Sequence, residues 1–152
     1  MLNFQFSPIA YVTNTRKEPT DDNWGAIIST ITLADEIPTI ALENIELFSH
    51  LEIIYHFHLV GDGNFVYSRH PRGNTAYPEM GILAQRNKDR PNYIGLCTVE
   101  LVAHDGRTLI VKNLDAIDGT PILDIKPVFK QFQPQSDTKQ PAWVDDLTKH
   151  YW

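Results

Sequence analysis

The sequence predicts an all-β protein, a small antiparallel β-barrel with minor helices. Runs of roughly five to nine residues, rich in β-branched side chains, recur along the chain and are typical of strands. Turns containing Gly, Pro or Asn separate these runs, and helical periodicity is scarce. The strand–helix alternation of a doubly wound fold is missing, and so is a GxGxxG motif after the first strand. No Rossmann domain is therefore expected.

The expected elements follow from residue pattern in chain order. The expected strands are residues 4–12, 26–33, 51–59, 80–85, 95–103, 108–112 and 122–125. A polar loop is expected over residues 13–24, and a longer one over residues 60–78. Pro38 and the residues after it predict a short helix with Thr39 as its N-cap. His104-Asp105-Gly106-Arg107 predicts a hairpin turn.

Residues 1–152 are expected to form one barrel domain, with residues 130–152 as a linker and tail. The linker is polar and contains Gln and Pro, whereas the tail predicts a short amphipathic helix. Trp143, Leu147 and Tyr151 would share one side of that helix. Because exposing Trp143 and Trp152 is costly, the tail is expected to pack on the domain or on a second subunit.

Composition limits the compartment and the partners. No apolar run approaches the roughly 18 residues of a membrane span, and no basic-then-apolar signal begins the chain. The single cysteine, Cys97, is expected to be a buried structural thiol, and the protein is expected in the cytoplasm. Its formal charge of −6 weighs against nucleic-acid binding, which usually needs a basic face. A local cluster of cationic side chains nevertheless occurs between Arg69 and Arg90.

The segment LDAIDGTPILDIKP, residues 114–127, is the most informative motif in the chain. Asp118-Gly119 favours a turn with positive φ that exposes backbone N–H groups, and Pro121 stiffens its exit. Such a turn presents backbone donors and a carboxylate together. The motif therefore indicates a site for a polar ligand.

Four segments together resemble the TsaA/TrmO-like (YaeB) family of S-adenosylmethionine-dependent methyltransferases. Residues 114–127 are similar to that family's most recognisable motif. FSHL at residues 48–51, followed by HFH at residues 56–58, resembles its FSHLW…FH segment. RHPRGN at residues 69–74 resembles a shortened RPPRxGGN, and AQRNKDRPNYIG at residues 84–95 resembles ATRSPxRPNPIG.

The resemblance implies a small β-barrel that binds S-adenosylmethionine without a Rossmann domain, generally as a homodimer. It implies that His58, with Leu59 beside it, and Arg86 contact the cofactor. Leu96, next to Gly95, is a candidate for apolar contact to the base, with a plain core role as the alternative. The resemblance also implies a role for the turn of Ile117, Asp118, Gly119 and Thr120. Its backbone N–H and C=O groups would bind the adenine edge, and Asp118 would accept a hydrogen bond from a hydroxyl or the ammonium of the cofactor.

The chain departs most from the family where PRQPG is expected, because DDNWG stands there at residues 21–25. We hypothesise that Asp22, Asn23 and Trp24 line the cofactor pocket. An indole face stabilises a cation such as the sulfonium, and Asp22 would pair with the ammonium. The alternative is a solvent-facing loop with Trp24 tucked onto the barrel.

The family's reaction is N6-methylation of threonylcarbamoyladenosine in tRNA. If it transfers, Arg69, Arg72 and Arg90 are candidates for phosphate or carboxylate contact, and Asn92 is one for the purine. Asp124 or His56 would accept a proton, although no residue stands out as an obligatory base. The acidic balance, the altered residues 21–25 and the lack of a C-terminal extension after Trp152 favour a small-molecule acceptor instead. A further alternative is a protein that binds S-adenosylmethionine without turnover.

His56 and His58 lie two apart on an expected strand and share a face. This HxH spacing also presents two metal ligands in several barrel enzymes, with Glu52 or His70 as the evident further ligands. A packed, hydrogen-bonded histidine pair is the favoured interpretation, so no metal is predicted.

Overall fold

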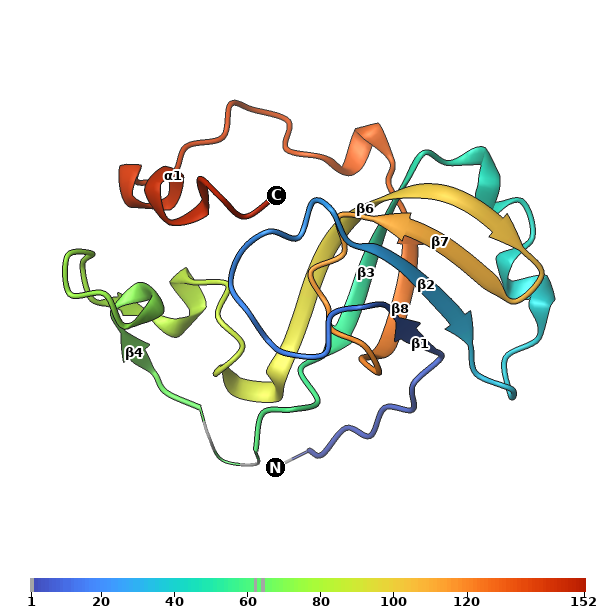
Figure 1. Ribbon diagram of the computed structural model, residues 1–152, viewed down its shortest axis with the longest axis horizontal. Coiled ribbons are helices and arrows are strands. Elements are labelled where there is room, and N and C mark those ends of the chain that lie inside the picture. Colours follow the sequence, from blue (N-terminus) through green and yellow to red (C-terminus); the bar gives the residue numbers. More distant parts are fainter. Residues whose placement is uncertain (1, 62, 64) are drawn as a thin grey trace.

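The computed structural model describes residues 2–61, 63 and 65–152, and its centre is a closed barrel of six antiparallel strands (Figure 1). In spatial order the barrel strands are β1 (Ala10–Thr13), β2 (Ile28–Leu33), β7 (Thr108–Lys112), β6 (Ile94–Asp105), β3 (His50–His56) and β8 (Pro121–Pro127). A separate two-stranded sheet joins β4 (Ser68–Arg69) to β5 (Met80–Gly81). The expected antiparallel barrel is confirmed.

The helices are short and lie outside the barrel. The 3₁₀ helices are η1 (Thr39–Leu42), η2 (Ile45–Leu47), η3 (Pro71–Gly73), η4 (Ile82–Ala84), η5 (Pro91–Tyr93) and η6 (Lys130–Phe132). The α-helix α1 (Ala142–Thr148) lies beside the small β4–β5 lobe, away from the hairpin end of β6 and β7 (Figure 1). In the described part of the chain, no helix has the length and apolar character to cross a membrane.

Alternation of apolar side chains fills the barrel from β3 and its neighbours. Leu51 and Ile53 point inward and face Val99 and Cys97 of β6 in register. Tyr55, the next inward residue, lies opposite Gly95, where a Cβ would come within 2.4 Å of the tyrosine ring. Only glycine therefore leaves room for this ring, which carries its hydroxyl to one end of the barrel.

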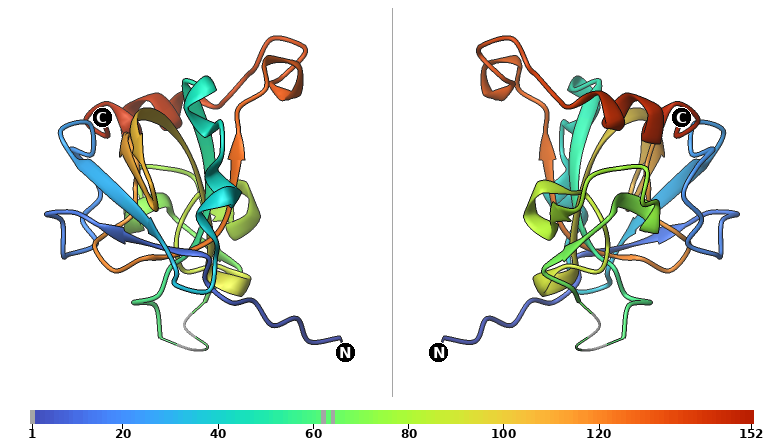
Figure 2. Two further views of the ribbon diagram at one scale, coloured as in Figure 1. Left: turned by 90° about the vertical axis from the view of Figure 1, so that its right-hand side faces the viewer. Right: turned by 90° about the vertical axis from the view of Figure 1, so that its left-hand side faces the viewer.

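Several expected elements differ in the structure. The strand expected over residues 51–59 ends at His56, so His58 and Leu59 lie in the turn after it. The first strand is β1 alone, because only its four residues have ladder partners; Leu2, Phe4 and Phe6 precede it in an exposed arm that projects from the barrel (Figure 2). The expected strand over residues 80–85 stops at Gly81, where the chain turns into η4. Thr39 is inside η1 rather than at its N-cap, which is Pro38, a residue without a side-chain donor or acceptor.

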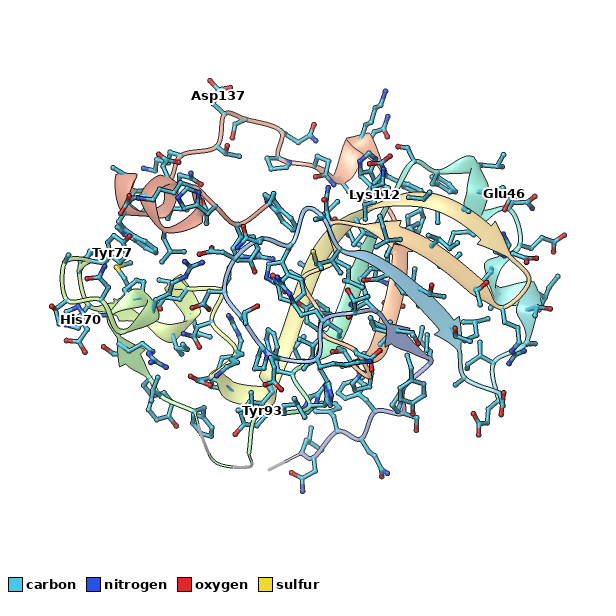
Figure 3. All side chains as sticks on the ribbon, in the orientation of Figure 1. Glu46, His70, Tyr77, Tyr93, Lys112 and Asp137 are labelled. Atoms are coloured by element: carbon cyan, nitrogen blue, oxygen red, sulfur yellow. The ribbon has the colours of Figure 1, made fainter. Side chains whose placement is uncertain are left out.

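The tail forms the predicted helix, α1, followed by residues 149–152 that return toward the barrel (Figure 1). Tyr77 of the small lobe packs its ring 6.1 Å from that of Trp143 and donates to Asp146 at 2.6 Å. Figure 3 labels Tyr77 in that lobe, far from Glu46 at the other end of the molecule. The tail thus packs on its own chain, as one of the two expected alternatives.

Candidate functional site

The turn at residues 117–120 lies at one end of the barrel beside His58. Gly119 has φ +78° and donates its N–H to the carbonyl of Val12 at 2.8 Å. A Cβ at Gly119 would lie 3.8 Å from Nε2 of His58, so this position approaches the imidazole closely. The structure therefore brings His58 and the predicted adenine-reading turn together, as the resemblance implied.

The carboxylate of Asp118 is held by its neighbours on the first loop. Lys17 forms an ion pair with it at 2.5 Å, and the backbone N–H of Asn14 donates to it at 3.0 Å. These contacts, with Lys17 the larger, lower the pKa of Asp118. Asp118 is thus an anion, and its N–H donates to the carbonyl of Arg16 at 2.8 Å.

Arg86 and Leu96 form a second predicted pair. The guanidinium of Arg86 is exposed and donates a hydrogen bond to the carbonyl of Leu96. Leu96 points outward from β6 and keeps 45% of its surface exposed, and Leu59 is also exposed. Both leucines therefore offer apolar surface to a ligand, and Arg86 offers a planar cation.

A polar cluster surrounds Asp115, which precedes Asp118 by three residues in the same loop. The hydroxyl of Tyr55 lies 2.8 Å from one carboxylate oxygen of Asp115, and the hydroxyl of Tyr151 donates to the other. Burial raises the pKa of Asp115, whereas these hydrogen bonds and the positive charge of Arg86 act in the opposite direction. Next to it, burial raises the pKa of the Cys97 thiol to about 12, which confirms a buried structural cysteine.

Residues 21–25 form hydrogen bonds with the tail and with the first loop. Trp24 is buried, and the guanidinium of Arg16 lies 4.2 Å from its ring centroid. Arg16 also donates to the carbonyls of Asp22 and Asn23 at 2.8 and 3.2 Å. The N–H of Trp24 donates in turn to the carbonyl of Tyr151 at 2.7 Å. One face of the indole therefore already binds a cation of the same chain.

Of the predicted substrate residues, Arg69 and Arg72 lie in the small lobe, whereas Arg90 and Asn92 lie at η5 just before β6. Most of them make contacts within the chain. Arg69 pairs with Asp89 at 2.6 Å, and Arg72 pairs with Asp22 at 2.8 Å. Arg90 donates to the carbonyl of Gln85 at 2.8 Å, whereas Asn92 is exposed at φ 65°. The pair of Arg72 and Asp22 borders a hollow of about 180 Å³ that Tyr77, Asp146 and His150 also line.

Several residues of the site escaped the sequence patterns. Arg16 belongs to none of the family motifs, and only its stacking on Trp24 reveals its place. The pattern of residues 114–127 gives Asp115 no role of its own, and alternation in residues 51–59 gives Tyr55 only a strand face. Tyr151 was assigned to an amphipathic face, so its bond to Asp115 had no signal in the sequence. These residues are brought together only by the barrel closing and the tail folding back.

His56 and His58 do not form part of a metal-ligand cluster in the structure. Among residues 2–61, 63 and 65–152, no group of three His, Cys, Asp or Glu side chains is placed to hold a metal ion. The His56 ring contacts Tyr93 edge-on, with centroids 6.0 Å apart. Burial and the neighbouring His56 lower the pKa of His58, which favours its neutral form.

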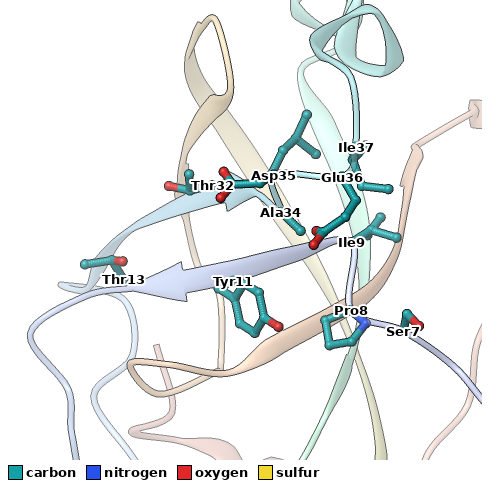
Figure 4. A pocket seen from close by; sticks show the side chains of 11 residues that line it. Ser7, Pro8, Ile9, Tyr11, Thr13, Thr32, Ala34, Asp35, Glu36 and Ile37 are labelled. Atoms are coloured by element: carbon teal, nitrogen blue, oxygen red, sulfur yellow. The ribbon is translucent and has the colours of Figure 1, made fainter.

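A larger hollow, of about 770 Å³, lies elsewhere on the barrel (Figure 4). It lies between the exposed arm, β1 and the loop after β2, and Tyr11, Asp35, Glu36 and Ile37 are among the residues lining it. None of the predicted site residues lines this hollow. It is therefore separate from the candidate site.

Comparison with known proteins identifies the family. Residues 11–134 match the family model described as the tRNA-methyltransferase O N-terminal domain. A probable S-adenosyl-L-methionine-binding protein of Pyrococcus abyssi is 33% identical over 150 residues, which cover 92% of this chain and 76% of that protein. The tRNA (adenine(37)-N6)-methyltransferase of Escherichia coli is 41% identical over 91 residues, covering 57% of this chain and 39% of that enzyme.

Solved structures agree with the sequence matches. A crystal structure of TrmO from Pseudomonas aeruginosa superposes with a TM-score of 0.73 at 26% identity, covering 91% of this chain and 62% of that one. The chain thus spans less than two thirds of that protein and of the Escherichia coli enzyme.

Fold and comparisons together describe a β-barrel protein, built without a Rossmann domain, that is similar to S-adenosylmethionine-dependent methyltransferases. Within that class, the chain belongs to the TrmO family. The expected family, fold class and cofactor are confirmed.

Proposed function

We propose that this chain binds S-adenosylmethionine at the Asp115 end of the barrel and transfers its methyl group to an adenine N6 of tRNA. The observation that carries the proposal is the close approach of Gly119 to His58. It unites two motifs that are about sixty residues apart in the chain, each predicted to contact the cofactor.

The residues of this site fit the four chemical parts of the cofactor. Arg86 would hold the carboxylate through its planar fork, and Asp118 would accept from the ribose hydroxyls or the ammonium. The turn at residues 117–120 would contact the adenine edge together with His58. Leu59 and Leu96 would cover the apolar faces of the base. When bound, the cofactor supplies the methyl group on a cationic sulfur, and the protein supplies position and exclusion of water.

Residues 21–25 support the same site from the side of the tail. Asp22 and Asn23 present their carbonyls to Arg16, and Trp24 lies beneath the same guanidinium. Their contact with the cofactor, including the sulfonium–indole contact, remains part of the proposal. Replacing Trp24 by Phe tests it, because Phe keeps an aromatic face and weakens the attraction for a cation. A selective loss of affinity for S-adenosylmethionine over its neutral thioether product would support the contact.

The methyl acceptor follows from the relatives whose names state one, which act on tRNA adenine 37. Arg90 and Asn92 would contact the nucleotide. Arg69 and Arg72 would also contact it once their ion pairs with Asp89 and Asp22 break. A small-molecule acceptor is the second candidate. It is favoured by the pairing of Arg69 with Asp89 and of Arg72 with Asp22, because paired cations offer less charge to phosphates.

Two measurements test the proposal. Calorimetry with S-adenosylmethionine should show one site per chain, and no binding at millimolar ligand would remove the cofactor assignment. Methyl-labelled S-adenosylmethionine should then label tRNA isolated from a strain lacking this gene. Binding without labelled tRNA, but with labelled small molecules from a cell extract, would favour the second candidate. Binding without any transfer would indicate a non-catalytic binding protein.

The proposal includes a homodimer that acts in the cytoplasm, where tRNA is modified. Exposed apolar side chains on the outer face of the barrel support self-association: Tyr11 of β1, Ile28 of β2 and Ile110 of β7 keep 46%, 48% and 36% of their surface exposed. Light scattering on the purified chain would give the mass of the assembly, and a monomer at all concentrations would contradict this part.

A further inference from the structure

We propose that Asp115 is a further catalytic residue of this site: its carboxylate binds the N–H of the methyl acceptor and takes up the proton that methylation releases. The inference rests on the proposed function, because it requires an acceptor that carries an N–H group. It assigns a role to a side chain that lies beside the cofactor residues without being one of them.

The first observation is that Asp115 is a largely buried carboxylate without a cationic partner in direct contact. Its side-chain oxygens meet the hydroxyls of Tyr55 and Tyr151. Of the side chains that the structure describes, none places a cationic nitrogen within 4.0 Å of it. A carboxylate that is largely buried and has no ion-pair partner is costly to keep ionised. Such groups occur where charge or protons are exchanged.

The second observation is its place among the predicted cofactor residues. Asp115 is three residues from Asp118 in the same loop, and the charge of Arg86 acts on it through space. Arg86 is in turn bonded to the carbonyl of Leu96, next to Cys97 on β6. A cofactor held by Arg86 and the turn at residues 117–120 would therefore reach the loop that carries Asp115.

The two tyrosines that bind Asp115 are held differently. Tyr55 is inside the barrel, only 2% exposed, with its ring fixed against Gly95. Tyr151 belongs to the tail, which reaches the site after residues 134–141, all of them exposed and outside helices and strands. Tyr55 is thus a fixed donor from the barrel wall. The backbone of Tyr151 stays bonded to the N–H of Trp24, so in this proposal only its side chain turns away from the carboxylate. The acceptor N–H takes the place of the Tyr151 hydroxyl on the carboxylate.

The step balances in atoms and charge. The acceptor nitrogen uses its electron pair to form the new N–CH₃ bond, while the S–CH₃ bond breaks and its electron pair stays on sulfur. The cationic sulfonium becomes a neutral thioether. The N–H proton passes to an oxygen of Asp115, and the electron pair of that bond stays on nitrogen. The anionic carboxylate thus becomes a neutral acid, which its buried place favours.

The two bases suggested by the sequence are less well placed. Asp124 is half exposed on β8 and pairs with Lys126 at 2.7 Å. His56 lies on the outer side of β3 against the ring of Tyr93. Neither contacts the cluster formed by Asp115, Tyr55 and Tyr151.

The test is Asp115→Asn, which keeps the size of the side chain and an acceptor oxygen for one of the two tyrosines but cannot take up a proton. The matched control is Asp137→Asn on the exposed linker. The measurement is single-turnover transfer from methyl-labelled S-adenosylmethionine to tRNA from a strain lacking this gene. We expect the rate to fall about a hundredfold or more, the usual contribution of a positioned base, with cofactor affinity unchanged.

The tyrosines provide a second readout that a purely structural role would not move. Each hydroxyl favours the ionised carboxylate, so Tyr55→Phe should move the acidic limb of both kcat and kcat/KM to higher pH. Tyr151→Phe should move only the kcat/KM limb, which reports the free protein, because the acceptor has replaced Tyr151 in the complex. The titratable groups facing Asp115 are Tyr55 of β3, Cys97 of β6, Arg86 and Tyr151 of the tail.

Four results would overturn the inference. Unchanged transfer by Asp115→Asn removes the catalytic role, and lost cofactor binding in that variant returns Asp115 to the cofactor site. Equal shifts of both limbs in Tyr151→Phe would show that the tyrosine stays on the carboxylate during the reaction. If the unaltered chain binds S-adenosylmethionine but labels no tRNA, the proposed function fails first and this inference fails with it.

Discussion

The guanidinium of Arg16 lies 4.2 Å from the ring centroid of Trp24 and donates to two carbonyls of the segment that holds that tryptophan. This contact joins the first loop of the barrel to residues 21–25. The N–H groups of Asn23 and Trp24 then bond to the carbonyls of His150 and Tyr151. Loop, segment and tail therefore form one layer over the end of the barrel that holds Asp115.

Trp24 should contribute to stability through this layer. Replacing a buried tryptophan by alanine leaves a cavity, and Trp24→Ala should lower the free energy of unfolding by about 3–5 kcal/mol. Urea unfolding followed by circular dichroism measures this change. Phe132→Ala, at a side chain that is 80% exposed, should change it by no more than about 0.5 kcal/mol. Equal effects of the two changes would contradict the buried position of Trp24.

Gly25 should control the docking of the tail. A Cβ at this position would lie 2.6 Å from the backbone carbon of Trp152, so Gly25→Ala must push the two segments apart. Overpacking of this kind costs about 1–3 kcal/mol, or roughly five- to a hundredfold in a local equilibrium. Hydrogen exchange at the amides of Asn23 and Trp24 should accelerate by that factor. Gly81→Ala is the control, because its Cβ would lie 4.0 Å from the nearest atom.

Arg86→Ala should weaken binding of S-adenosylmethionine while the fold persists. A hydrogen bond to a charged group contributes about 1.5–3 kcal/mol, which corresponds to roughly ten- to a hundredfold in affinity. Calorimetry measures the affinity, and thermal unfolding checks the fold. Lys139→Ala removes an exposed cation of the linker as the control. Unchanged affinity in a folded Arg86→Ala protein would assign the arginine to its bond with the Leu96 carbonyl.

The free energy of unfolding should depend on pH because of Asp115. Burial raises the native pKa of Asp115 above its ordinary value of 3.8. At a pH between these two pKa values, the folded state holds a proton on Asp115 that the unfolded state has lost. Stability therefore falls as pH rises from near 3.8 through the raised native pKa, and it is flat above that.

Asp115→Asn should remove this fall, since an amide does not titrate. The difference in free energy of unfolding between the unaltered chain and the variant, measured by urea titration at several pH values, isolates the contribution. A difference that is constant with pH would mean that the native pKa of Asp115 is ordinary.

The barrel and its family follow from the sequence because their signals are local. Alternation in residues 51–57 predicts one buried face, and Leu51, Ile53 and Tyr55 are indeed inside. The turn at Gly119 has a positive φ, which the Asp118-Gly119 pair predicts. Strand ends are less local. The expected strand over residues 4–12 shortens to β1 because pairing depends on where β2 and β8 end, and no pattern within the strand records that.

The sequence by itself determined the strand faces, the turn at residues 117–120 and the residues of the family's motifs. Only the tertiary structure decided which of these meet. Barrel closure brings Gly119 to His58, and the returning tail brings Tyr151 to Asp115, across 36 residues. It also pairs Arg69 and Arg72 with acidic residues 20 and 50 positions away. Such contacts depend on the relative placement of whole elements, whereas a pattern in one segment reports only its own backbone and its own buried face.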